Sequence, residues 1–274
     1  MRSLLLFVTN FLAERNNIMP TVNEIYTYLN SLIPSSLSCE WDNDGLLCCA
    51  DKSAEVSRIL ITLDITDSVV EYAKNNKYNV ILSHHPLIFK GVKAVNTDIG
   101  VSRRLIELIS SSITAMSFHT RLDTVNGGVN DILATTLGLK NVQTFETEGL
   151  DMGRVGELPR AMNRDELALY IKEKLGAPYV NYNGPCKEIK RLAVLGGAGK
   201  DEILCAASTG ADAYLTGELG HHSLTDATDF GIALFEAGHH YTEFPVCSAL
   251  EKIINEKFPD IHTDIYNSIA IKTV

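Results

Sequence analysis

Residues 57–86 read SRILITLDITDSVVEYAKNNKYNVILSHHP. The stretch divides into an apolar strand at 57–63, a helix at 66–76 and a second apolar strand at 79–83, which runs directly into His84-His85-Pro86. This order of elements is that of a β-α-β unit. Strands that are apolar almost throughout, with helices between them, are typical of sheets covered on both faces, and in such sheets ligands bind beyond the carboxyl ends of the strands. The stretch therefore predicts an α/β fold.

The same pattern continues along the chain and then repeats. A helix is expected at 101–110 and a strand at 113–118, which runs into His119-Thr120-Arg121-Leu122-Asp123. The second half shows a strand at 191–195, a turn at 196–199, a helix near 201–209 and strands at 211–216 and 232–235. As a result, His119-x-x-x-Asp123 and His239-x-x-x-Glu243 both follow the third strand of their half. We infer an internal duplication that gives two related α/β lobes, with mixed or largely parallel sheets covered by helices.

Boundaries between the parts of the chain follow from helix signals and from the duplication. Thr21 and Glu24 form a capping box, which predicts a helix near 21–33 and makes residues 1–18 an appended segment. We assign residues 19–128 and 244–274 to the first lobe and residues 129–243 to the second. A further helix is expected at about 165–175, capped at Asn163.

Composition limits the possible partners. The 274 residues hold 24 Lys+Arg and 34 Asp+Glu, and a net charge of −10 repels phosphate backbones, so nucleic acid is not an expected partner. No run approaches the ~20 apolar residues that span a bilayer, so we expect no membrane association. The apolar N-terminal run breaks at Thr9-Asn10 without a small-residue cleavage site, and the six cysteines show no C-x-x-C spacing. We therefore expect a cytoplasmic protein with reduced thiols.

The histidines are the strongest functional signal in the sequence. Six of the eight form the adjacent pairs 84/85, 221/222 and 239/240, a seventh is His119, and His262 is read as an ordinary side chain. Neighbours at a strand end point in different directions, so His84 and His85 reach one site only if the backbone leaves strand geometry, as the following proline encourages.

Two spaced pairs add carboxylates to the histidines. In His119-x-x-x-Asp123 and His239-x-x-x-Glu243, four-residue spacing on a helical turn places an imidazole and a carboxylate on one face, although such pairs also form ordinary surface hydrogen bonds. Imidazole and carboxylate without thiolate suit Zn²⁺, Fe, Mn²⁺ or Ni²⁺. Because five or six such ligands exceed what one catalytic ion takes, the sequence predicts two divalent metal ions per chain.

Three other motifs have a plainer interpretation. Gly196-Gly197-Ala198-Gly199-Lys200-Asp201 could present N–H groups to an anion, but it fits neither phosphate-binding pattern and is better read as a tight turn. Asp42-Asn43-Asp44-Gly45 begins like a calcium loop, yet its twelfth position is Ser53, so we read an Asx-type turn beside Trp41. His221-His222, behind Thr216-Gly217-Glu218, either supports the metal site or caps a helix.

Five motifs in this order resemble the Nif-three-like family, whose members are named GTP cyclohydrolase I type 2 homologues. They are Trp41-Asp42-Asn43-Asp44-Gly45-Leu46, Ser83-His84-His85-Pro86-Leu87, His119-Thr120-Arg121-Leu122-Asp123 with Gly127-Gly128-Val129-Asn130-Asp131, Thr216-Gly217-Glu218, and Gly238-His239-His240-Tyr241-Thr242-Glu243. The resemblance extends from Met19 to Val274 and implies a dinuclear metal site between the two lobes and a toroidal homohexamer. It also implies that the chain lacks the inserted middle domain of longer members.

The resemblance also suggests roles for individual residues. It implies that the metal ligands are His84, His85, Asp123, His239 and Glu243. His119 matches a family histidine close to the metals, which we assign to proton transfer or to support of the ligands. Arg121 stands where the family usually has Asn, and its guanidinium is expected to hold a phosphate or carboxylate of the substrate. Glu218 replaces the more common Asp, and Glu218 and His222 are expected near the metals or the substrate.

We interpret the chain as a dinuclear metal-dependent hydrolase acting on a small molecule, with metal-activated water attacking a ring carbon, an amide or a phosphoester. The family name suggests GTP cyclohydrolase-type activity. However, a triphosphate needs several cationic groups, and only Arg121, Lys90 and Lys93 lie near the motifs. The alternative is a protein that binds or delivers metal without catalysis, or a hexameric regulatory scaffold.

Overall fold

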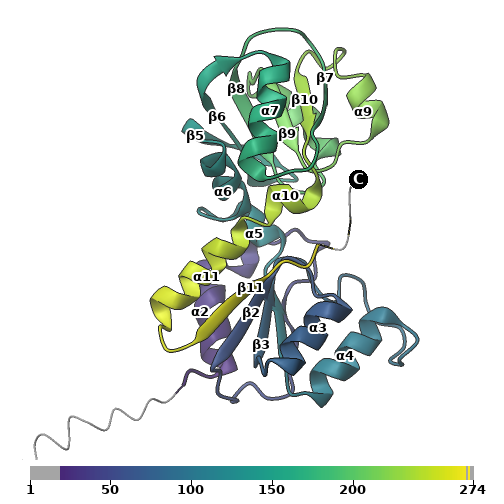
Figure 1. The fold of residues 1–274 in the computed structure, drawn as a ribbon, viewed down its shortest axis with the longest axis vertical. Coiled ribbons are helices and arrows are strands. Elements are labelled where there is room, and N and C mark those ends of the chain that lie inside the picture. The colour runs from purple at the N-terminus through teal and green to yellow at the C-terminus, as the bar shows by residue number, and fades with distance from the viewer. Residues whose placement is uncertain (1–18, 270, 272–274) are drawn as a thin grey trace, which may run out of the picture.

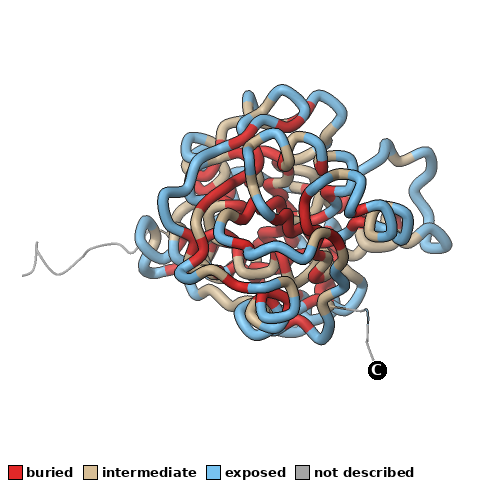
Figure 2. The backbone as a smooth tube through the Cα atoms, turned by 90° about the horizontal axis from the view of Figure 1, so that it is seen from above, coloured by how far each residue is buried: buried red, intermediate tan, exposed pale blue. Residues whose placement is uncertain are grey.

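The computed structural model describes residues 19–269 and 271. Two lobes, each built on its own β-sheet, lie one above the other along the longest axis of the molecule (Figure 1). Buried segments run through the interior and exposed segments lie on the outside (Figure 2). The predicted appended segment 1–18 lies outside the described residues. No helix in the described part of the chain is long and apolar enough to cross a membrane.

The first sheet has five strands in the order β1-β4-β3-β2-β11. All neighbouring strands run parallel except β1, which is antiparallel to β4. Their bounds are β1 Gly45–Cys48, β2 Arg58–Thr62, β3 Val80–Ser83, β4 Thr114–Ser117 and β11 His262–Tyr266. Because β11 pairs with β2, the C-terminal segment adds a strand to this sheet. The lobe boundaries after residues 128 and 243 stay predictions.

Helices cover both faces of the first sheet. On one face, Leu60 and Ile81 pack in a core cluster with side chains of α3 (Asp67–Asn75) and α4 (Gly100–Ser110). On the other face, Ile59 and Leu82 pack with side chains of α2 (Val22–Leu32) and α11 (Val246–Lys257). Two-sided burial explains why β2 and β3 are apolar along almost their whole length.

The second sheet has six strands in the order β5-β6-β8-β9-β10-β7. Strands β8, β9 and β10 are parallel, whereas β5, β6 and β7 pair antiparallel with their neighbours. Their bounds are β5 Lys140–Thr147, β6 Leu150–Met162, β7 Asn181–Asn183, β8 Ile189–Leu195, β9 Ala213–Thr216 and β10 Ala233–Glu236. Side chains of α6 (Val129–Thr136) and α7 (Arg164–Leu175) pack on one face, and those of α8 (Ile203–Ser208) on the other.

The two sheets repeat one plan. Three consecutive parallel strands lie in the order β4-β3-β2 in the first sheet and β10-β9-β8 in the second. In each set, the last strand along the chain, β4 or β10, has an antiparallel neighbour. A short helix follows this strand in both lobes: α5 (Thr120–Thr124) after β4 and α10 (His239–Glu243) after β10. The predicted α/β fold with two related lobes is confirmed, and both sheets are mixed.

Local signals placed two helix starts correctly. Thr21 caps α2 and Asn163 caps α7, each in a reciprocal capping box with the glutamate three residues later. The helix expected at 201–209 is divided into the 3-10 turn η2 (Lys200–Glu202) and α8. A second 3-10 turn, η1 (Ser35–Leu37), and the short helix α9 (His221–Thr225) complete the elements of the described chain.

Candidate metal centre between the two lobes

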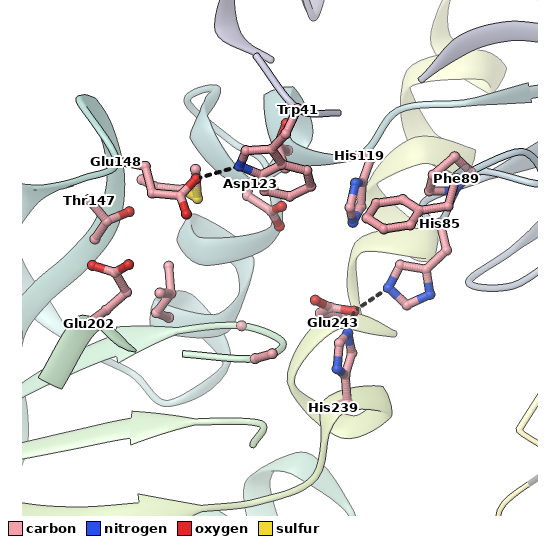
Figure 3. Close-up of a pocket in the computed structure, with 16 residues that line it drawn as sticks. Trp41, His85, Phe89, His119, Asp123, Thr147, Glu148, Glu202, His239 and Glu243 are labelled. Carbon is pink, nitrogen blue, oxygen red and sulfur yellow. Dashed lines mark hydrogen bonds and ion pairs between the residues drawn. The ribbon is translucent and has the colours of Figure 1, made fainter. Parts of the chain in front are cut away.

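The strand ends of both lobes bring the histidines together. His84 and His85 follow β3, His119 follows the neighbouring β4, and His239 begins α10 after β10 of the second sheet. Because the carboxyl ends of parallel strands meet at one sheet edge, these side chains converge between the lobes. In Figure 3, His85, His119, Asp123, His239 and Glu243 surround one space.

Six side chains form three overlapping groups that could hold metal ions. The ligand atoms of each group lie within 4.8 Å of one another. The groups are His84, His85 and His119; His85, His239 and Glu243; and His84, Asp123 and Glu243. Glu243 is shared by two groups, as expected of a carboxylate between two cations. The cluster includes all five predicted ligands and His119.

Two buried atoms in this cluster, His84 Nε2 and Asp123 Oδ1, have no hydrogen-bond partner among the described residues. Glu243 Oε2 lies 2.9 Å from His85 Nε2 and 3.1 Å from His239 Nε2, so it faces two imidazoles. The side chains of His84, Asp123 and Glu243 are only 0%, 13% and 5% exposed. His84 Nε2 lies 3.6 Å from Asp123 Oδ1 and 3.8 Å from Glu243 Oε1, beyond ordinary hydrogen-bond distance. Buried polar atoms are rarely left unpaired, and an absent ion is one recognised reason. The residues therefore fit a cation.

The other ring nitrogen of each histidine faces an acceptor outside the cluster. His84 Nδ1 lies 2.9 Å from the carbonyl oxygen of Phe118, and His85 Nδ1 lies 2.7 Å from Asp64 Oδ1. His119 Nδ1 lies 2.9 Å from Asp42 Oδ1, and His239 Nδ1 lies 3.0 Å from Glu218 Oε1. Donation from Nδ1 to such an acceptor fixes the tautomer and leaves Nε2 free to bind a metal. Glu218 is therefore in the supporting position that the sequence suggested, whereas Asp64 and the role of Asp42 were missed.

The two buried carboxyl groups have pKa values displaced in opposite directions. Burial, and then the charge of Glu243, raise the pKa of Asp123 well above its usual value. Burial alone would also raise the pKa of Glu243, but the imidazoles of His239 and His84 hold it well below its usual value. A divalent cation between them would relieve the repulsion that disfavours the charge on Asp123.

The glycine turn after β8 lies directly under the cluster. A Cβ atom on Gly197 would lie 2.2 Å from Glu243 Oε1, and the residue has a φ of +70°, so only glycine is accommodated there. The N–H groups of Gly196 and Gly197 donate to Asn130 Oδ1 and Thr242 Oγ1 within the protein. The interpretation as a tight turn is supported, and these two N–H groups are not available to an anion.

Arg121 does not lie where the sequence analysis expected it. Its side chain is 1% exposed, and its Nε donates to Asp44 Oδ2 at 2.8 Å. Its Nη1 donates to Asn30 Oδ1 and to the carbonyl of Ile33. The expected contact with a substrate anion is wrong for this structure, because the guanidinium is buried among its own partners outside the cavity beside the cluster. Asp44 also accepts the backbone N–H of His119, so the pair fixes the start of α5.

His222 is not brought to the centre either. It is exposed on α9, where its ring contacts that of His221. Lys90 and Lys93 are exposed and do not line the cavity beside the cluster. The segment Asp42 to Gly45 does more than form a turn, because Asp42 accepts hydrogen bonds from His119 Nδ1 and from Thr120.

A cavity of about 450 Å³ opens beside the cluster. One end is formed by cluster residues, and the walls include Trp41, Phe89, Met152 and Leu195. Thr147, Glu148 and Glu202 lie at the opposite end (Figure 3). The volume is within the ~300–1,000 Å³ typical of small-molecule sites.

Comparison with known proteins identifies the family of the chain and structures with the same fold. The chain matches the model of the family Duf34/NIF3 (NGG1p interacting factor 3) over residues 20–272. It is 33% identical over 241 residues to the GTP cyclohydrolase 1 type 2 homolog of Clostridium perfringens, with 86% of this chain and 92% of that protein covered. It is 34% identical over 232 residues to Protein NIF3 homolog of Schizosaccharomyces pombe, with 78% and 82% covered. The structure of Staphylococcus aureus hypothetical protein SA1388 matches with a TM-score of 0.85 and 28% identity, covering 93% of this chain and 100% of that one.

Proposed function

The chain belongs to the Duf34/NIF3 family, as its motifs indicated, and on that premise we propose that it is a hydrolase dependent on two divalent metal ions. The observation that carries the proposal is the buried cluster in which His84 Nε2 and Asp123 Oδ1 have no hydrogen-bond partner among the described residues and Glu243 faces the imidazoles of His85 and His239. His84 and Asp123 would hold one ion, His85 and His239 the other, and Glu243 would contact both. Zn²⁺, Fe, Mn²⁺ and Ni²⁺ all suit these ligands.

The bound ions would supply Lewis-acid activation of a water molecule and of the bond to be broken. The chain's own groups bind the substrate and move the protons. His119 lines the cavity, and its Nδ1 faces Asp42 Oδ1 at 2.9 Å, so Nε2 is free to accept or donate a proton at the cluster. Asp64 and Glu218 keep His85 and His239 oriented.

The reaction class follows from this arrangement. A ring carbon, an amide or a phosphoester each presents an electrophilic centre suited to it. The name GTP cyclohydrolase 1 type 2 homolog, printed for the Clostridium perfringens relative, makes ring opening the first reaction to assay. A cytoplasmic location and a homohexamer stay part of the proposal.

Elemental analysis of untagged protein tests the metal centre. We expect about two divalent ions per wild-type chain. Glu243→Gln should remove most of both ions because it alters two ligand groups, whereas His239→Ala should remove about one. His262→Ala is the matched control, because His262 is exposed and outside the cluster. Stoichiometric absence of metal after reconstitution with zinc, iron and manganese would overturn the proposal.

A second variant separates hydrolysis from metal storage. His119→Ala should retain most of the metal but lose turnover on a panel of cyclic amines, amides and phosphoesters, because proton transfer commonly contributes about 10²–10⁴-fold to a rate. Metal-replete wild-type protein without turnover on any substrate of the panel would instead favour a metal-binding or metal-delivery role.

A further inference from the structure

The cavity beside the cluster has chemically different ends. Asp123, His239 and Glu243 lie at the metal end, and Glu148 and Glu202 lie at the end away from it (Figure 3). A ligand whose reacting atom lies at the cluster must therefore place its remaining groups between the walls and beside these two glutamates.

The walls favour a flat ligand. Trp41 and Phe89 are 54% and 47% exposed, although both line the cavity, and their ring centroids are 6.0 Å apart. Met152 and Leu195 supply buried apolar surface inside it. Exposed aromatic side chains beside a cavity are typical of sites that bind ring systems through their faces and edges.

The charges in the cavity exclude a large anion from its far end. Apart from the histidines, its charged lining residues are all carboxylates, namely Asp123, Glu148, Glu202 and Glu243, and neither Lys nor Arg lines it among the described residues. A polyphosphate brings several negative charges and is normally bound by Arg, Lys or backbone N–H groups. Cations bound at the cluster would attract one anionic group there, but they would not change the sign of the opposite end.

Glu148 is held at the far end by contacts across the two lobes. It is the first residue of the two-residue turn between β5 and β6, with a φ of +52°, a backbone conformation that non-glycine residues rarely adopt. Its Oε2 accepts hydrogen bonds from Trp41 Nε1 at 2.9 Å and from Cys39 Sγ at 3.3 Å. Within the described residues these contacts leave Oε1 available to a ligand.

Glu202 places a second carboxylate at this end. It is the last residue of η2, directly before α8, and is half-buried. Burial, with a contribution from the charge of Glu148, raises the pKa of its carboxyl. A ligand group that donates N–H bonds, or carries positive charge, would stabilise both carboxylates.

We propose that this cavity binds a planar ring that bears amine or amidine donors and lacks a polyphosphate, with the ring beside Trp41 and Phe89 and the donors at Glu148 and Glu202. This inference names the substrate class of the proposed hydrolase and rests on that function only for the reaction, not for binding. Ring systems with exocyclic or ring amines are accordingly the first substrates to test.

Trp41 allows a direct test because it is the only tryptophan of the chain and lines the cavity. Its emission is titrated with benzamidine, benzamide and benzoate, which have the same shape and charges of +1, 0 and −1, and with GTP. Protein as purified and protein dialysed against EDTA are compared, so that binding of benzoate or GTP at the metal end is recognised by its loss after dialysis. We expect benzamidine to bind most tightly of the four in the dialysed protein, with a Kd on the order of 1 mM for so small a probe.

Glutamine variants show which carboxylates cause the preference for a cationic ligand. Glu202→Gln keeps the shape of the side chain and should weaken benzamidine roughly five-fold while benzamide binding stays unchanged, because charge-assisted hydrogen bonds are about twice as strong as neutral ones. Glu148→Gln should act in the same direction. The control is Glu146→Gln, an exposed residue of β5 that does not line the cavity.

Three results would overturn the inference: benzoate or GTP binding the dialysed protein as tightly as benzamidine, equal benzamidine binding by wild type, Glu202→Gln and Glu148→Gln, or no saturable binding by any probe. Metal content and turnover are measured separately. A metal-replete hydrolase without the charge preference would thus refute the substrate class alone, and a charge-selective protein without metal would refute only the hydrolase.

Discussion

Replacing Arg121 with methionine should strongly destabilise the protein. The ion pair of Arg121 and Asp44 is buried, with side chains 1% and 5% exposed and an N–O distance of 2.8 Å. Methionine retains much of the apolar volume but leaves the Asp44 carboxylate uncompensated. Removing one partner of a buried pair costs about 3–5 kcal/mol. With about 2–4 °C of midpoint change per kcal/mol in a chain of this size, the thermal midpoint should fall by about 6–20 °C.

Arg103→Met is the matched control. Arg103 pairs with Asp67 at 2.6 Å, a shorter distance than in the buried pair, but these side chains are 43% and 54% exposed. Exposed pairs contribute about 0–1 kcal/mol, so this variant should unfold within about 4 °C of the wild type. Asp67 also keeps Arg104 as a partner at 2.9 Å, so Arg103→Met removes an exposed ion pair without leaving a carboxylate unpaired.

Thermal unfolding followed by circular dichroism gives both values, and a double variant tests the cause. Asp44→Asn neutralises the charge that Arg121→Met leaves behind, so Arg121→Met with Asp44→Asn should be more stable than Arg121→Met alone. If Arg121→Met unfolds no earlier than Arg103→Met, the reasoning is refuted. Weaker substrate binding by Arg121→Met at an unchanged midpoint would favour the anion-binding role expected from the sequence.

Three further predictions concern other parts of the chain. Cys186 is exposed and should react first with iodoacetamide at pH 8. Burial raises the pKa of Cys39 to about 12, which leaves a thiolate fraction of about 10⁻⁴ at this pH. Mass spectrometry of the labelled peptides would contradict this prediction by finding Cys39 modified first. Asn163→Ala should lower the free energy of unfolding by about 1 kcal/mol through loss of the α7 cap, and urea titration should show that Asn163→Asp largely preserves it. His222→Ala should leave the metal content unchanged, because this residue is exposed on α9. Loss of an ion from this variant would show that His222 contributes to metal binding.

The sequence predicted those strands whose environment is uniform. Segments 57–63, 79–83 and 113–118 become β2, β3 and β4 because burial on both faces requires continuous apolar character. No continuous apolar run marks β5, because its residues are mostly exposed. In the long strand β6, Gly153 and Pro159 interrupt the apolar pattern, and the pairing with β5 and β8 shifts in register. Neither strand was predicted.

The candidate site also contains residues whose placement the sequence predicted and one whose placement it did not. The histidines and carboxylates of the cluster were predicted, because strand ends and four-residue spacing are local features of sequence. The burial of Arg121 was not, since its partners Asn30, Ile33 and Asp44 lie 77 or more positions away in the chain. A lone arginine beside candidate ligands has the same local pattern whether it points into the cavity or into the protein.

The carboxylates that orient the histidines nevertheless follow a rule of sheet topology. His85 follows β3, and its acceptor Asp64 follows the neighbouring parallel strand β2. His239 follows β10, and its acceptor Glu218 follows the neighbouring parallel strand β9.

For His119, which follows β4, the neighbouring strand β1 is antiparallel, so the same sheet edge lies before β1, and its acceptor Asp42 is found there. In each case, the oriented imidazole and its carboxylate lie at the same edge on adjacent strands. Once strand order is known, such carboxylates can be located from the sequence. Both lobes therefore present an imidazole together with the carboxylate that orients it, and the candidate metal centre between them includes side chains from both.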